Sequence, residues 1–321
     1  MGFRLKDAET LPDGIKRITY DQIDRSLDRL ELNTRNKDRA IHEARVGFKR
    51  IRAILRLIRG EIGPENFKLE NQTYRDAGRQ LSAARDNTVV ADTLEELIND
   101  CDKHLAQPDI KLLRKRLRRL RADQLREKGE QLPQIAENIK QARARVQDWP
   151  LNNDSFVAIA FGLKKTYKQG RRKFENAQYE KTTVNLHEWR KDVKYLWYQV
   201  TVLNALWPKP LDAFAGELSK LSGFLSEDHD LAMLRQRASK QAETLGESTE
   251  ITNLIQLLDH RRTELQTKAR SLGLRIYAEK PQDFCARLES YWNAWRPGTA
   301  RIPENEQLTL VRYAASNDGR D

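Results

Sequence analysis

The sequence predicts an all-α protein built from two pseudo-symmetric helical bundles, produced by an internal duplication, around a central basic groove or pore. Three observations lead to this fold class. Apolar residues recur at helical spacing, several motifs occur twice in the same order, and one predicted helix has a continuous row of basic side chains. We find no convincing run of alternating apolar and polar residues that would indicate a strand.

Four motifs occur twice at nearly constant separation. "TYDQIDRSL" from Thr19 resembles "TYKQGRRKF" from Thr166 at an offset of 147, and "HEARVGFKR" from His42 resembles "HEWRKDVKY" from His187 at an offset of 145. "LSAARDNTVV" resembles "LSEDHDLAML" at an offset of 144, and "LLRKR" resembles "LLDHR" at 145. Their shared order and spacing indicate two copies of one helical unit.

We expect six helices in each copy, within a single domain over residues 1–297 and ahead of a C-terminal tail at 298–321. The copies span about 15–148 and 155–297, and "QDWPLNNDS", which offers turn and helix-capping residues, joins them. In the first copy the expected helices are 18–35, 39–59, 66–85, 87–105, 110–128 and 133–147. In the second copy they are 155–176, 183–206, 211–226, 228–242, 248–271 and 281–295.

The basic row lies on the second expected helix, "IHEARVGFKRIRAILRLIRG". At 100° per residue, the row begins at His42 and stays within an arc of about 100°. Apolar residues flank it on both sides, which suits a helix whose basic side looks into a groove between neighbouring helices; a solvated charged surface is the alternative. Glu43 and Arg50 fall outside the row, and we expect them to face solvent. The basic members of the row are Arg45, Lys49, Arg52, Arg56 and Arg59.

The second copy has a shorter basic row. His187, Arg190 and Lys194 occupy the same arc, Lys191 lies nearby, and Trp197 replaces one of the arginines. Each row is preceded by a helix with further candidate anion donors, for which packing and solvated charge are equally good interpretations. These candidates are Tyr20, Arg25, Lys165, Tyr167, Arg171 and Arg172.

The composition favours an anionic partner. The 321-residue chain has a formal net charge of +11, with 33% charged and 39% hydrophobic residues. Its two cysteines, Cys101 and Cys285, argue against a disulfide framework, and the longest apolar run, "FVAIAFGL", is too short to cross a bilayer. Because the first residues lack the apolar core of a signal peptide, we expect a soluble, cytoplasmic protein without a membrane partner.

The motifs favour binding over catalysis. Both histidines lie in H-E-x-R, where a zincin needs H-E-x-x-H, so we expect no metal site and no cofactor. We find no phosphate-binding glycine-rich loop and no acidic cluster ready to hold Mg²⁺. For Asp86 and Asp230, an ion pair or helix cap is a better interpretation than a catalytic role. Two other functions stay open for this chain: a nucleic-acid-binding helical protein, and an enzyme of polyphosphate metabolism.

The duplicated motifs resemble the CHAD family, the conserved histidine α-helical domain. The resemblance covers about residues 15–295, and its motifs begin at His42, Leu81, Tyr167, His187 and Leu225. It implies a helical fold of two pseudo-symmetric bundles, binding of inorganic polyphosphate and, as in some members, association with polyphosphate granules. It also implies a ligand-facing set, His42, Arg45, Lys49, Arg52, Arg56, His187, Arg190 and Lys194, followed by Arg25, Arg171 and Arg172. The E-x-E-x-K motif of a fused triphosphatase module is not found, so that activity is not expected.

Overall fold

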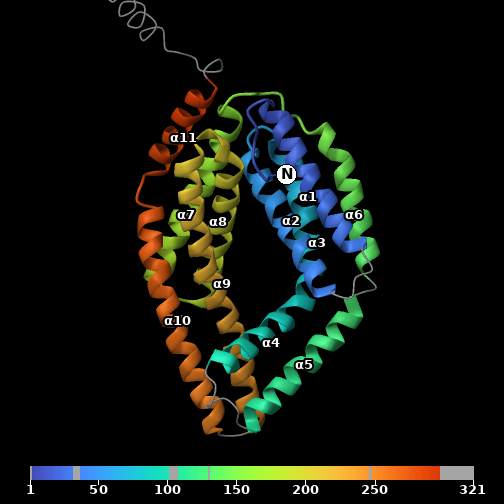
Figure 1. Ribbon diagram of the computed structural model, residues 1–321, viewed down its shortest axis with the longest axis vertical. Helices are drawn as coiled ribbons and strands as arrows, with labels where there is room; N and C mark the ends of the chain where they lie inside the picture. Colours follow the sequence, from blue (N-terminus) through green and yellow to red (C-terminus); the bar gives the residue numbers. More distant parts are fainter. Residues whose placement is uncertain (1, 32–36, 101–107, 129–130, 246–247, 297–321) are drawn as a thin grey trace, which may run out of the picture.

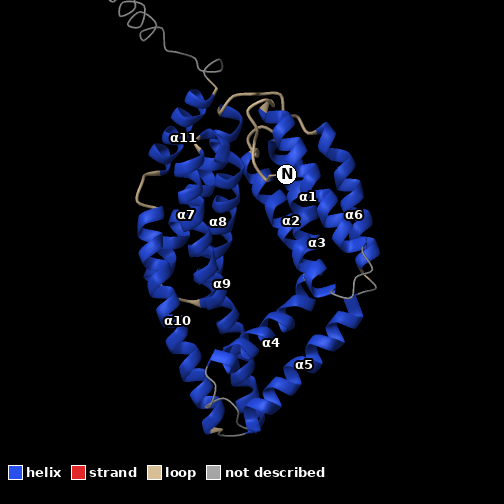
Figure 2. Ribbon diagram, in the orientation of Figure 1, coloured by secondary structure: helices blue, strands red, loops and turns tan. Residues whose placement is uncertain are grey.

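The computed structural model describes residues 2–31, 37–100, 108–128, 131–245 and 248–296, and these residues form helices joined by loops (Figures 1 and 2). The all-α class is therefore confirmed, with no strand in the described ranges. The C-terminal tail, 298–321, lies outside them. The helices are α1 (Leu11–Glu31), α2 (Lys37–Leu57), α3 (Gly63–Gln80), α4 (Ser82–Asp100), α5 (Pro108–Lys128), α6 (Leu132–Arg145), α7 (Val157–Tyr179), α8 (Thr183–Val202), α9 (Pro208–Leu245), α10 (Thr249–Ile276) and α11 (Pro281–Trp295).

The helices form a ring. α1, α2, α3 and α6 pack together on one side, α7 to α11 pack on the other, and α4 and α5 reach across to the lower ends of α9 and α10 (Figure 1). The two sides touch at the upper end, where α2 contacts α7 and α8. Segments from both halves of the chain thus build both closures of the ring, while the internal duplication itself stays a prediction.

One predicted helix boundary was wrong. Residues 211–226 and 228–242 were expected to be separate helices, but α9 is continuous over both. "SEDHD" contains good N-cap residues, yet their side chains have other partners: Ser226 Oγ donates to the Ser222 carbonyl at 2.6 Å, and buried Asp228 accepts from Arg262 at 3.1 Å. Since these two side chains are not available to cap a new helix, α9 continues.

The start of α1 was also predicted too late. The helix begins at Leu11 and not at residue 18, because the Thr10 hydroxyl accepts a hydrogen bond from the Asp13 amide at 3.2 Å and so caps it. Further on, η2 (Leu203–Leu206) continues α8 as a 3-10 turn over residues expected to be α-helical. Thr182 caps the start of α8 and Ser248 caps the start of α10, each through a side-chain oxygen that accepts a backbone hydrogen bond.

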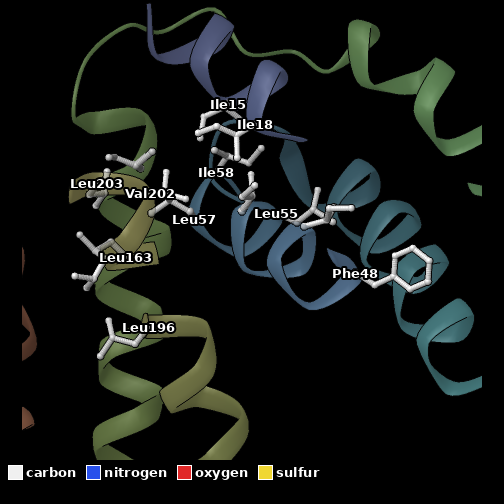
Figure 3. Packing of buried hydrophobic residues seen from close by; sticks show 14 of the residues in the cluster. Ile15, Ile18, Phe48, Leu55, Leu57, Ile58, Leu163, Leu196, Val202 and Leu203 are labelled. Atoms are coloured by element: carbon white, nitrogen blue, oxygen red, sulfur yellow. The ribbon is translucent and has the colours of Figure 1, made fainter. Parts of the chain in front are cut away.

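Two large apolar cores hold the ring. The larger one joins α1, α2, α7 and α8, and it includes Ile15, Leu55 and Leu163 (Figure 3). The smaller one lies at the lower closure and combines Leu94 of α4 and Leu113 of α5 with Leu234 of α9 and Leu254 of α10, each no more than 1% exposed. Burying such side chains contributes roughly 1.5–3 kcal/mol each, so both closures are stabilised by the hydrophobic effect.

At the upper closure, α7 lies directly on the backbone of α2. A Cβ atom on Gly162 would be 1.9 Å from the Leu57 carbonyl oxygen and 2.3 Å from that of Arg56. Beside this contact, the Gln199 side chain of α8 donates to the Ala53 carbonyl of α2 at 3.1 Å and lies 3.1 Å from the Thr166 hydroxyl of α7. These contacts fix the position of α2 against α7 and α8.

Candidate functional site

The two basic rows meet where α2 faces α8. The Lys49 ammonium lies close enough to Arg190 of α8 for their charges to repel, and Arg45 and Arg52 of α2 add to the repulsion. Burial, followed by these guanidinium groups, lowers the pKa of Lys49 from 10.5 to about 8, while Asp230 of α9 partly offsets the effect. The structure therefore brings cations from both halves of the chain into one partly buried place.

The upper part of the α2 row is held by a neighbouring helix. Arg52 Nε and Arg56 NH1 donate to the Asn71 side-chain oxygen of α3 at 3.1 and 2.8 Å. The Arg56 guanidinium also lies 4.0 Å from the centre of the Tyr195 ring of α8, an arrangement typical of a cation–π contact. Burial lowers the pKa of both arginines. These side chains are ordered donors, since packing has already fixed their orientation.

The α8 row is completed by a histidine from α9. The rings of His187 and His229 lie 4.7 Å apart at 39°, and within the described chain neither buried Nδ1 atom has a hydrogen-bond partner. Burial and the charge of Arg190 lower the pKa of His187, and the same two causes lower the pKa of His229 to about 3. Lys194 contributes to both shifts. Both rings are consequently neutral near pH 7 when no anion is bound.

Arg190 is oriented by α9, whereas Lys191 points outwards. Arg190 Nε donates to Ser226 Oγ at 3.0 Å. Lys191 is exposed and forms an ion pair with Glu188, which also lies 3.4 Å from the Lys173 ammonium. Lys191 thus lies at the margin of the α8 row and already has a counter-charge.

A pocket of about 940 Å³ opens between α1 and α2, on the other side of the α2 row. His42 and Arg25 line it together with Arg50. Arg50 was expected to face solvent, and this was wrong: its guanidinium lies 5.1 Å from the Phe3 ring and 5.8 Å from the Tyr198 ring, and it donates to Gln22 at 3.1 Å. The N-terminal segment and α8 cover that side of α2. The pattern of residues along one helix could not indicate this cover, because it comes from segments distant in the sequence.

Glu43, the other residue expected to face solvent, lies beside the same pocket. Its carboxylate pairs with Arg39 of α2 at 2.9 Å and with Arg29 of α1, so it is only half exposed. The Arg39 and Arg29 guanidinium groups lower the pKa of this carboxyl. Glu43 therefore links α1 to α2 next to His42.

The remaining candidates lie apart from the α2–α8 site. Tyr20 packs beneath Arg143 of α6, whose guanidinium is 4.9 Å from its ring. Tyr167 is fully buried, with its hydroxyl donating to the Ile276 carbonyl at 2.9 Å, so it belongs to the core. Arg171 donates to the Glu279 carbonyl at 3.0 Å, on the side of α10 and α11. Lys165 and Arg172 lie on the outer part of α7, half-buried and exposed respectively.

Several residues of the site were not predicted. His229 was visible in "LSEDHDLAML" but was considered only as a neighbour of Asp230. Asn71 and Tyr195 gave no signal, because the sequence does not say which side of α3 faces α2 or which ring an arginine covers. Asp230 lies near Lys49, as an ion-pairing role requires; the side chain of Asp86 lies outside the described residues.

The described residues contain no group of three or more His, Cys, Asp or Glu side chains arranged to hold a metal ion. Within the same residues, none of the helices combines the length and the apolar character needed to traverse a bilayer.

Comparison with known proteins agrees with the helical architecture. The sequence model of the CHAD domain matches residues 20–239. Among solved structures, the crystal structure of the CHAD domain from the plant Ricinus communis is similar, with a TM-score of 0.60 at 16% sequence identity. The similarity covers 90% of this chain and 95% of that one, and it shows a shared fold. A search of curated proteins gave no match.

Proposed function

Because the chain belongs to the CHAD domain family, we propose that it binds inorganic polyphosphate, without catalysis, in a groove lined by Lys, Arg and His side chains between α2 and α8. The observation that carries the proposal is the position of Lys49. A partly buried ammonium beside Arg45, Arg52 and Arg190 is costly in the free protein, and a bound polyanion would remove much of this cost.

The chemistry of polyphosphate suits these side chains. The polymer offers only negative charge and acceptor oxygens, at short regular spacing and without bases. Arginine can bind such oxygens with two parallel hydrogen bonds, and lysine acts as a point charge. The orientation of Arg52, Arg56 and Arg190 by Asn71 and Ser226 supports binding, because less side-chain entropy is lost when the ligand arrives.

The same place is less suited to nucleic acid. Base stacking needs an accessible aromatic face, but Tyr195 and Tyr198 are each 6% exposed and are already covered by arginines. A polymer of phosphate alone uses the cations and leaves these rings in place. We therefore rank nucleic acid second as a ligand for this groove, and we assign no reaction to it.

Calorimetric titration tests the proposal. Long-chain polyphosphate, single-stranded RNA, duplex DNA and ATP are compared at two salt concentrations, with Lys49→Met and a matched control, Lys115→Met on exposed α5. We expect polyphosphate to bind most tightly, and Lys49→Met to lower its affinity by about 10- to 100-fold. Equal losses in both variants, or equal and salt-labile binding of all four polyanions, would contradict the groove.

In the cell, we propose a cytoplasmic protein that collects on polyphosphate granules. A fluorescent fusion should form foci that coincide with the granules, and the Lys49→Met fusion should be diffuse at equal abundance. Foci that persist in this variant would show that another surface tethers the protein.

A further inference from the structure

The outer face of α7 has features that the α2–α8 groove does not use. Val157, Phe161 and Tyr179 are 67%, 55% and 95% exposed, which is unusual for large side chains on one helix. They share an arc of about 100° with four cations. The cations are Lys164, Lys165, Lys168 and Arg172.

This arc lies between two lines of contact and is itself uncovered. On one side, Gly162 of α7 packs against the carbonyls of α2, and on the other the Cys285 thiol of α11 lies 3.6 Å from the Ala160 carbonyl. Phe161 leans against Gly60, where an added Cβ would be 3.4 Å from its ring. Phe161 is thus steadied from one side while more than half of it remains accessible.

The four cations of this face outnumber its acidic residues. In the part of the chain that the structure describes, no carboxylate forms an ion pair with any of the four cations; the one acidic residue within the arc, Glu175, pairs with Arg171 at 3.3 Å. Glu289 of α11 and Lys164 both act on the pKa of the Cys285 thiol, so Glu289 lies at the edge of the face. The Lys165 ammonium is 5.5 Å from the centre of the Phe161 ring.

We propose that this α7 face is a second binding surface, and that its ligand is a single-stranded nucleic acid. Exposed aromatic rings interleaved with unpaired cations are the arrangement with which proteins hold single strands: bases stack on the rings and phosphates contact the cations. Phe161 and Tyr179 are about 27 Å apart along the helix, and the four cations lie between them in the same arc, where they can follow a backbone. Polyphosphate has no bases and would gain nothing from either ring.

An anionic membrane is the competing ligand, and it fits less well. A helix that lies in a membrane interface has a continuous apolar side. On α7 the apolar residues are separated by Lys164 and Lys168, so no such side is formed. Because the proposed contacts are made by aromatic rings with bases and by cations with phosphates, we expect DNA and RNA single strands to bind alike.

Fluorescence anisotropy with labelled oligo-dT and oligo-U of about 12 nucleotides tests the proposal on the full chain. We expect Phe161→Ala to weaken binding by about 5- to 100-fold, because one stacked base is lost. Leu274→Ala is the matched control, since Leu274 is 57% exposed on α10 and should leave binding unchanged. Lys164→Gln with Lys168→Gln should reduce the salt dependence, log Kd against log salt, by about 1.4; Lys111→Gln with Lys115→Gln on α5 should not.

Three results would overturn the proposal. The first is equal behaviour of Phe161→Ala and Leu274→Ala with the oligonucleotides. The second is full displacement of the oligonucleotides by polyphosphate with no dependence on Phe161, which would indicate a generic basic surface. The third is Phe161-dependent capture by phosphatidylserine vesicles in place of the oligonucleotides. Polyphosphate affinity, measured beside each variant, should stay at the wild-type value because the α7 face lies outside the groove, so the two proposals can fail separately.

Discussion

Replacing Lys49 with methionine should make the protein more stable while it weakens polyphosphate binding. The pKa of Lys49 falls from 10.5 to about 8 on folding, a difference equivalent to about 3 kcal/mol at 1.36 kcal/mol per unit. Methionine keeps a flexible side chain of comparable length without the charge. At pH 7 we therefore expect Lys49→Met to increase the free energy of unfolding by up to about 3 kcal/mol.

The pH dependence of this gain follows from linkage. Between pH 8 and 10.5 the unfolded chain holds a proton at Lys49 that the folded chain has released, so wild-type stability rises with pH across this window. Below the window the full penalty is present, and above it the penalty vanishes. The advantage of Lys49→Met should accordingly be largest at pH 7 and small near pH 10.5.

Urea denaturation at both pH values provides the measurement, with the exposed Lys115→Met as a control expected to stay within about 0.5 kcal/mol of wild type. A Lys49→Met protein that is less stable than wild type at pH 7 would refute the reasoning, because it would mean that Lys49 stabilises the free fold. Higher stability together with lower polyphosphate affinity is the signature of a residue kept for its ligand.

Three further predictions concern packing, a candidate residue that lies in the core and proton uptake. Gly162→Ala should destabilise the protein by at least about 1–3 kcal/mol in thermal or urea denaturation, because its Cβ meets the α2 backbone, which cannot move aside as a side chain would. Tyr167→Phe should cost about 1–2 kcal/mol of stability, through the loss of a buried hydrogen bond to the α10 backbone, and leave polyphosphate affinity unchanged; a large loss of affinity would return Tyr167 to the binding set. Polyphosphate binding should take up protons near pH 6–7, because anion binding raises the lowered pKa values of His187 and His229, so affinity should fall as pH rises. Titration in two buffers of different ionisation enthalpy measures the uptake, which His187→Gln should reduce; heats that do not depend on the buffer would contradict it.

Helical periodicity was sufficient to predict the fold class and most helices. The order and bounds of α2, α5, α8 and α11 follow from apolar spacing, prolines and capping residues that act locally. Where local signals misled, a tertiary partner had taken the side chain. The clearest case is Asp228, which was expected to begin a separate helix but accepts hydrogen bonds from Arg262 and Gln266 of α10 in the structure.

The site could be predicted only in part, for a similar reason. A helical wheel places Lys49 and Arg190 on basic rows, and the resemblance to a duplicated family suggested that the rows face each other. Neither the helical wheel nor the resemblance shows that Arg50 lies under Phe3 and Tyr198. Neither shows that α7 places Tyr167 in the core and Lys165 on its outer side. Those positions depend on how helices distant in sequence pack, which spacing along one helix does not contain.

The two closures of the ring have a consequence for how the basic rows behave. Like charges on α2 and α8 would separate if the helices could move apart. However, the Gln199 and Gly162 contacts restrain their upper ends, and the leucine core of α4, α5, α9 and α10 ties the two sides together below. The fold therefore acts as a rigid frame that holds mutually repelling groups in register before any ligand arrives. A polyanion that binds here relieves the repulsion between the cations, and this relief favours binding. We therefore expect a polyanion to raise the melting temperature in proportion to the logarithm of its concentration.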